Sequence, residues 1–143
     1  MTTPLPGSLP KIHELGPDAS TAPFWQAARE HRLVVATCDN CGQHRCPPTP
    51  FCPTCLAQAT TYKHVSGQAT IYTYSIVRHA VIPELRDHIP YVIAIVELTD
   101  ANNTRLLTNI ITEHPETLHI GQPVKIAWDD LDNNTTIPRF IPA

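Results

Sequence analysis

The chain has 143 residues, of which 42% are hydrophobic, and its 10 basic and 13 acidic residues give a formal net charge of -3. A chain of this length and apolar content can bury enough surface to fold as one domain, which excludes a disordered protein. The acidic balance excludes a general attraction to phosphate backbones. The longest apolar run, Tyr91 to Val96, is far shorter than the ~20 residues that span a bilayer. Because no basic start followed by an apolar stretch marks a signal peptide, we expect a cytoplasmic protein without a membrane anchor.

The chain begins with a proline-rich arm, followed by one short helix. Five of the fifteen prolines fall in residues 1–23, so we expect an extended arm without a core of its own. The segment Pro23–His31 predicts an amphipathic helix, because Thr21 can cap it and Pro23 suits its first turn. The residues expected on its apolar stripe are Phe24, Ala27, Ala28 and His31. Leu33–Thr37 is β-prone and leads directly into Cys38.

After Cys55 the pattern is one of short strands separated by turns. The predicted strands are Ala69–Val77, Tyr91–Leu98, Arg105–Ile111, Val124–Trp128 and Pro138–Ile141. The second and third form a hairpin across residues 100–103, and His114–Leu118 predicts a helical turn between the third and fourth. Five strands with this helical insert predict a small closed barrel of the OB type. The fold class is therefore mainly β, with an arm (1–23), a helix plus zinc ribbon (24–60) and a five-stranded OB-fold barrel (61–143).

Four cysteines carry the strongest chemical signal in the sequence. Cys38 and Cys41 form one Cys-x-x-Cys pair, and Cys52 and Cys55 form a second after ten intervening residues. Two such turns supply the four thiolates of a tetrahedral zinc site, and a filled site makes the metal structural. Iron in a rubredoxin-like site uses the same ligands and stays an alternative, as do buried or redox cysteines. Gly42 allows the first turn a positive φ.

Cys46 is the odd cysteine, because a tetrahedral zinc already has four ligands. It lies between the two pairs and is most simply a spare thiol of the ribbon loop. A catalytic role for Cys46 or for the neighbouring His44 is the less favoured alternative, since a nucleophilic cysteine needs an oriented base in a pocket.

Several motifs together resemble a known family. They are Phe24-Trp25, Cys38-Asp39-Asn40-Cys41-Gly42, the Pro47-Pro48 pair, Cys52-Pro53-Thr54-Cys55, the Ser66-Gly67 turn into a Tyr-rich strand, Pro90-Tyr91-Val92, Val96-Glu97-Leu98, Ile120-Gly121-Gln122-Pro123-Val124 and Pro138-Arg139-Phe140-Ile141-Pro142. From Phe24 to Ala143 the chain resembles the acyl-CoA-associated OB-fold family with a rubredoxin-like zinc ribbon, long catalogued as a domain of unknown function. It departs from that pattern at Thr49, where an Arg is frequent, and at Tyr62, near which a Trp is frequent.

The resemblance implies a non-catalytic accessory subunit. Members of the family are typically partners of thiolase-like enzymes, of aldolases or of hydratases that act on acyl-CoA thioesters. We therefore expect this chain to bind and support such an enzyme, to help shape its CoA entrance, and to meet acyl-CoA only through the complex. Thr49 weakens any expectation that the ribbon loop binds a phosphate.

The segment 78–89 is the candidate docking loop. It would expose Val81, Ile82, Leu85 and Ile89 beside Arg78 and Arg86, which suits an interface. An ordinary loop whose apolar residues fold back onto the barrel is the equal alternative. Acid–base catalysis by His79 or His88 is disfavoured, because no partner group can be placed beside them.

The alternative function is a single-stranded nucleic-acid-binding OB protein, in which Tyr72, Tyr74 and Tyr91 would stack on bases. From residue 100 onward, however, the chain has three basic and six acidic residues, a balance that repels phosphates. We expect nucleic acid to be an unlikely partner. An independent enzyme is disfavoured by the lack of a catalytic motif.

Overall fold

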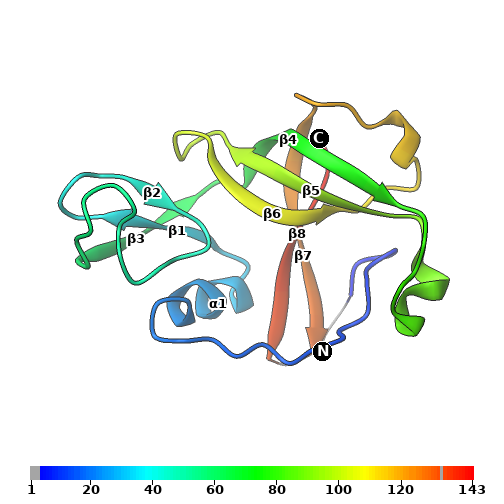
Figure 1. The fold of residues 1–143 in the computed structure, drawn as a ribbon, viewed down its shortest axis with the longest axis horizontal. Helices are drawn as coiled ribbons and strands as arrows, with labels where there is room; N and C mark the ends of the chain where they lie inside the picture. Colours follow the sequence, from blue (N-terminus) through cyan, green and yellow to red (C-terminus); the bar gives the residue numbers. More distant parts are fainter. Residues whose placement is uncertain (1–3, 133) are drawn as a thin grey trace.

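Two β-sheets joined at Ser66–Gly67 organise the chain (Figure 1). The computed structural model describes residues 4–132 and 134–143. Its elements are α1 (Ala22–Arg29), β1 (Leu33–Cys38), β2 (His44–Arg45), β3 (Thr60–Val65), β4 (Gln68–Val77), η1 (Pro83–His88), β5 (Tyr91–Leu98), β6 (Thr104–Ile110), η2 (Pro115–Thr117), β7 (Pro123–Asp132) and β8 (Thr135–Pro142). No helix in these ranges is long and apolar enough to cross a membrane.

The first sheet is the zinc-ribbon sheet, with the strand order β2-β1-β3. Strand β1 is central and almost entirely buried, which fits its continuous apolar sequence. It pairs antiparallel with β3 from Leu33–Val65 to Cys38–Thr60. The chain enters the second sheet only at Gln68, where β4 begins.

The second sheet is a closed barrel in the order β4-β5-β6-β8-β7, which confirms the predicted five-stranded architecture. The hairpin between β5 and β6 and the helical turn before β7 also form as predicted. Strands β7 and β8 are longer than expected. They stay paired from Val124–Pro142 to Asp132–Thr135. The ladder continues past the apolar segment because the carboxylates of Asp129 and Asp130 accept hydrogen bonds from side chains of β8.

Gly67 makes the close passage between the sheets possible. Its φ is +82°, and a Cβ built at this position would lie 2.3 Å from Cγ2 of Ile126. Only glycine fits there, because both the backbone conformation and the neighbouring side chain reject a larger residue. The two sheets share one core, in which Phe24 and Val35 from the ribbon side join Val96 and Phe140 from the barrel.

Helix α1 differs from the prediction at both ends. Thr21 occupies the N-cap position but its side chain caps nothing. The Asp18 carboxylate accepts hydrogen bonds from the backbone N–H groups of Ser20 and Thr21, each at 2.9 Å, and so orders the turn that precedes the helix. Phe24, Ala27 and Ala28 are buried as expected. His31 is not part of the apolar stripe: it lies beyond the helix with φ 56° and stacks on Trp128 with 5.7 Å between ring centroids.

The arm lies against the barrel in the described residues 4–21. In Figure 1 this dark blue segment passes below the barrel strands before it reaches α1. The backbone N–H of Leu5 donates to Oδ1 of Asp129 at 2.9 Å, and Lys11 Nζ contacts Oδ2 of Asp132 at 2.5 Å. The arm is thus attached to β7 by polar contacts.

Candidate metal centre and docking surface

The four predicted ligand cysteines converge at one end of the ribbon sheet. Their sulfur atoms all lie within 4.8 Å of one another, and the Cys38–Cys55 and Cys41–Cys52 Sγ pairs are each 3.5 Å apart. Sulfurs around a tetrahedral zinc with bonds of about 2.3 Å lie roughly 3.8 Å apart, so the cluster fits such an ion. The structure thus confirms that these cysteines are arranged for metal binding.

Two similar turns aim the cysteines at the centre. The N–H of Gly42 donates to the carbonyl of Cys38, and the N–H of Leu56 donates to the carbonyl of Cys52, both at 2.9 Å. Gly42 has φ 76°, as its position predicted, whereas the second turn places Leu56 at φ 64° without a glycine. This left-handed conformation strains the backbone of a leucine. Ligation of a metal by Cys52 and Cys55, in the same turn, would offset that strain.

Hydrogen bonds favour the thiolate form at two of these cysteines. A hydrogen bond from the Asn40 side chain and one from the Ala57 backbone lower the pKa of Cys55 to about 6. The backbone N–H of Cys55 lowers the pKa of Cys52 in the same way. Since thiolates are the metal-binding form of cysteine, the ribbon holds these two sulfurs ready for a cation.

Cys46 lies outside this cluster and has a different environment. Burial raises the pKa of its thiol to about 12, and its side chain packs against the shared core. His44 is a neighbour in sequence, but its Nδ1 contacts Oγ1 of Thr37 at 2.8 Å. Its place outside the four-sulfur cluster and its buried, protonated thiol favour the structural interpretation of Cys46 over a nucleophile.

Arg45 organises the loop between the two cysteine pairs, a role that the sequence analysis missed. Its Nε and Nη2 donate to the carbonyl of Thr49 at 3.1 and 2.9 Å, and Nη2 also donates to Oγ1 of Thr60 at 2.7 Å. The residue is buried. Thr49 therefore contributes its backbone carbonyl to this internal contact. The family pattern frequently has an Arg at position 49, whereas in this chain the guanidinium in the loop belongs to Arg45.

The segment 78–89 divides its apolar residues between the surface and the core. Val81 is 88% exposed, and Ile82 and Ile89 are also on the surface, whereas Leu85 is only 7% exposed. The expectation that Leu85 is exposed is therefore wrong: within the short helix η1 this side chain is buried. Among the described residues, the histidines in contact with carboxylates are His31 and His114, so His79 and His88 gain no acid–base partner.

The tyrosines proposed for base stacking are largely engaged within the protein. Tyr74 donates its hydroxyl to the carbonyl of Leu118 at 2.7 Å. Tyr72 is 42% exposed, but the guanidinium carbon of Arg105 lies 3.6 Å from the centre of its ring. Tyr91 lines a cleft between the barrel and the arm. These contacts leave no continuous aromatic platform among the three residues, which disfavours the nucleic-acid alternative.

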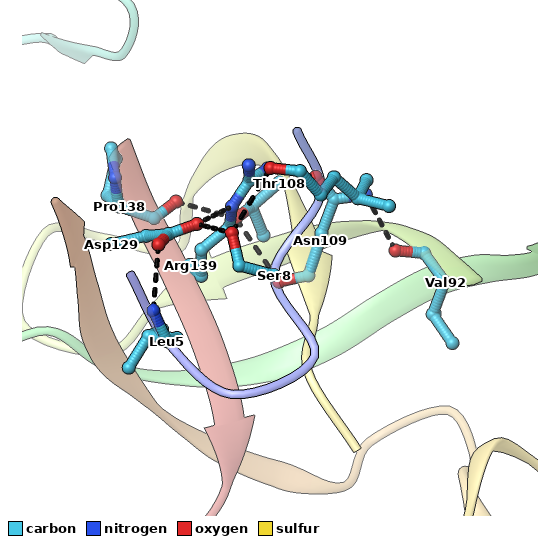
Figure 2. A network of polar contacts seen from close by, with 9 residues as sticks. Leu5, Ser8, Val92, Thr108, Asn109, Asp129, Pro138 and Arg139 are labelled. Carbon is cyan, nitrogen blue, oxygen red and sulfur yellow. Dashed lines mark hydrogen bonds and ion pairs between the residues drawn. The ribbon is translucent and has the colours of Figure 1, made fainter. Parts of the chain in front are cut away.

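A buried polar network joins the arm to the barrel, and the sequence analysis did not detect it (Figure 2). Asp129 on β7 is fully buried and accepts hydrogen bonds from the Ser8 hydroxyl and from Nε of Arg139 on β8, the latter at 3.1 Å. Nη1 of Arg139 donates to Oδ1 of Asn109 on β6, whose Nδ2 donates to the carbonyl of Val92 at 2.9 Å. In the sequence Asp129 directly follows the predicted strand Val124–Trp128, so no local pattern marked it as a buried strand residue.

Family models and curated relatives agree on the identity of this architecture. Residues 25–61 match the family described as the ChsH2 rubredoxin-like zinc ribbon domain, and residues 62–129 match the ChsH2 C-terminal OB-fold domain. A "DUF35 domain-containing scaffold protein" of Methanocaldococcus jannaschii is 34% identical over 107 residues, which are 73% of each chain. A "probable enoyl-CoA hydratase alpha subunit" of Thermomonospora curvata is 38% identical over 121 residues, but these cover 84% of this chain and only 37% of that protein.

Solved structures give the same result. A chain of the "Ltp2-ChsH2(DUF35) aldolase" is similar with a TM-score of 0.79 and 34% identity, covering 90% of this chain and 98% of that one. A DUF35 protein of unknown function from Sulfolobus solfataricus shares the fold, with a TM-score of 0.62 at 17% identity, over 85% of this chain and 83% of the other. The predicted resemblance is confirmed: the chain belongs to the DUF35 family of proteins that combine a rubredoxin-like zinc ribbon with an OB-fold.

Proposed function

We propose that this protein is a non-catalytic accessory subunit that binds and supports an enzyme acting on acyl-CoA thioesters, of the aldolase, hydratase or thiolase-like kind. The observation that carries the proposal is the similarity to a chain of the Ltp2-ChsH2(DUF35) aldolase, which extends over 98% of that chain. The relatives described as a hydratase alpha subunit and as a scaffold protein also support an accessory role in such an enzyme. The acyl-CoA would be met only through the complex, at an entrance that this subunit helps to shape.

The chemistry of the described residues supports a non-catalytic role. The cysteine cluster presents four sulfurs, which is the full number of ligands that zinc takes. A zinc ion bound there would have no open position at which to activate water. The buried ion pair of Asp129 and Arg139 is engaged within the protein. The exposed apolar side chains of Val81 and Ile82 are instead of the kind that a partner covers.

Cys38, Cys41, Cys52 and Cys55 are proposed to hold one structural zinc. Four thiolate ligands on two knuckles suit zinc, and the family model describes the segment as a zinc ribbon. Structural zinc contributes roughly 10 kcal/mol or more to ordering small modules of this kind. The metal would fix the ribbon, which in turn packs α1 and β1 onto the barrel.

Co-expression tests the accessory role. The tagged chain is produced together with an untagged acyl-CoA aldolase, hydratase or thiolase-like subunit encoded next to it, and the complex is isolated and assayed. We expect a stable complex whose activity exceeds that of the catalytic subunit alone, and no turnover by this chain alone. Turnover of acyl-CoA by the isolated chain, or failure of each enzyme class to associate, would contradict the proposal.

A further inference from the structure

Two arginines of the described residues are buried, Arg45 in the ribbon and Arg139 in the barrel, with 7% and 8% of their surface exposed. Arg139 has a counter-charge, because a carboxylate oxygen of Asp129 lies 3.1 Å from its Nε (Figure 2). Arg45 forms no ion pair with a carboxylate of the described residues. Buried charges in folded proteins are normally paired, so Arg45 lacks the partner that Arg139 has.

The hydrogen bonds of Arg45 leave one nitrogen of its guanidinium free. Nε and Nη2 donate to neutral groups, the carbonyl of Thr49 and the hydroxyl of Thr60. Nη1 is buried without an acceptor, and it is the one buried side-chain nitrogen or oxygen in the described part of the chain that has no partner. An unpaired donor of a charged group is costly to bury. Arg45 therefore lacks both a counter-charge and one hydrogen-bond acceptor.

Arg45 lies in the wall of a groove between the ribbon and the barrel, with a volume of about 650 Å³. Pro53 belongs to the ribbon side of this groove. The barrel side includes Asn102, Asn103 and Arg105, at the turn before β6 and at its start. No residue of the segment 78–89 lines the groove, so it is separate from the candidate docking loop.

The charges that line the groove leave a net charge of +1. Glu97 and Arg105 pair with each other, with 3.3 Å between Oε1 and Nε. His44 is uncharged at neutral pH, because burial lowers the pKa of its imidazole. The charge that remains is that of Arg45. A single carboxylate would neutralise it, whereas a phosphate dianion would leave an excess negative charge beside Glu97.

Large apolar side chains are exposed beside the groove. Phe51 is 53% exposed and Leu56 is 72% exposed, two and three residues along the chain from Pro53. Exposed apolar groups next to a buried arginine are typical of a surface that binds another protein. A small free carboxylate would leave Phe51 and Leu56 in water, whereas a protein surface would cover them.

We propose that this groove receives the carboxylate of an Asp or Glu side chain of the partner enzyme, which pairs with Arg45. The proposal rests on the proposed function, since it assigns an anchoring contact to the same complex. The segment 46–59, between β2 and β3, contains no helix or strand, so a shift of this loop can open Nη1 to the entering group. The acidic side chain supplies to Arg45 what Asp129 supplies to Arg139.

Acetate tests the chemistry of the groove on the isolated, zinc-loaded full chain at constant ionic strength. NMR follows the side-chain N–H resonances of the arginines during the titration. We expect saturable binding that shifts the Nε resonance of Arg45. Acetamide, the neutral analogue, should cause no saturable shift, and phosphate should bind no more tightly than acetate, because the groove lacks a second free positive charge.

Variants that each change one charge in the groove test the assignment. Glu97→Gln should strengthen acetate binding at least about threefold, and Arg105→Gln should weaken it at least about threefold. Arg45→Met should abolish it. Lys125→Gln removes an exposed cation outside the groove and is the matched control, with no expected effect. Thermal unfolding and metal content show whether each variant is folded, and the Glu97 and Arg105 variants keep the test valid if Arg45→Met does not fold.

The co-expressed complex tests whether the carboxylate comes from the partner enzyme. Arg45→Met and Arg105→Gln should weaken assembly at least about tenfold, and Lys125→Gln should leave it unchanged. A complex that is insensitive to both groove variants would overturn this proposal alone, even if acetate binds. Absence of a complex with the wild-type chain would instead refute the accessory role on which the proposal rests.

Two results with the isolated chain would also overturn the proposal. The first is the absence of saturable acetate binding to the wild-type chain. The second is a loss of metal in Arg45→Met together with unchanged acetate binding in Glu97→Gln and Arg105→Gln, which would assign the charge of Arg45 to the thiolate cluster.

Discussion

Asp129 on β7 and Arg139 on β8 are diagonal neighbours in the β7–β8 ladder and form a buried ion pair, with 3.1 Å between Oδ2 and Nε. The carboxylate is fully buried and also accepts hydrogen bonds from the arm, so one side chain connects the arm with two barrel strands. Buried charges are stable only when they are paired and fully hydrogen-bonded. This pair therefore makes the position of the arm depend on the closed barrel.

Asp129→Asn should destabilise the fold by about 3–5 kcal/mol, because it leaves the Arg139 guanidinium buried without its counter-charge. Urea unfolding followed by circular dichroism measures the loss. Asp87→Asn, at an exposed position of η1, is the matched control and should shift the free energy of unfolding by less than about 0.5 kcal/mol. Equal stabilities of the two variants would contradict a structural role of the pair.

Removal of one ligand cysteine should abolish the metal site, whereas removal of the odd cysteine should not. Cys41→Ser takes away one of the four clustered sulfurs, and Cys46→Ser takes away the half-buried thiol outside the cluster. We expect about one equivalent of zinc in the wild type and in Cys46→Ser, and far less in Cys41→Ser, by elemental analysis. Loss of the metal in Cys46→Ser would show that the four ligands were wrongly chosen.

The contact between Lys11 and Asp132 should be sensitive to acid. The hydrogen bond from Lys11 lowers the pKa of Asp132 to about 2, below its ordinary value of 3.8. The folded state therefore binds this proton less readily than the unfolded state does. The stabilisation is complete above the ordinary value and is lost as the pH falls through the folded value, so the relevant window lies between pH 4 and pH 2.

A carboxyl NMR titration checks this assignment. The Asp132 resonance should titrate near pH 2 in the wild type and closer to 3.8 in Lys11→Met. Glu14→Gln removes the other, exposed partner of Lys11 and should change the titration of Asp132 little. An unshifted titration in Lys11→Met would mean that the arm does not make this contact in solution.

The segment around Val81 is expected to touch the catalytic partner. Val81→Asp combined with Ile82→Asp should weaken the complex at least about tenfold, because carboxylates buried in an interface lose their hydration. Both side chains are on the surface, so the unfolding temperature of the isolated chain should not change. Ile120→Asp is the control for a general loss of surface hydrophobicity. Retention of the partner by the double variant, measured by gel filtration, would exclude this loop from the interface.

Binding to single-stranded DNA or RNA should be weak and should disappear at physiological salt. The acidic excess from residue 100 onward and the engaged side chains of Tyr72 and Tyr74 leave no cationic, aromatic track. Fluorescence anisotropy with labelled oligonucleotides at increasing salt concentration measures the affinity and its dependence on salt. Submicromolar affinity at physiological salt would restore the nucleic-acid alternative.

The sequence by itself determined the features that depend on local spacing. The spacing of the two Cys-x-x-Cys turns is enough to predict a four-sulfur cluster. Alternating apolar residues bounded by turn signals predict the strands from β4 to β6. Strand β5 therefore begins at Tyr91 and ends at Leu98, as predicted. Family membership followed from the ordered combination of these motifs.

Only the tertiary structure decided which polar groups meet across the barrel. Asp129 and Asp130 looked like the end of a strand, yet β7 continues through them, because Arg139 and Thr136 supply partners from the neighbouring strand. Leu85 is buried while Val81 is exposed, although both lie in one short segment. In each case the outcome depends on a group that the fold brings near, and a local pattern carries no information about such a neighbour.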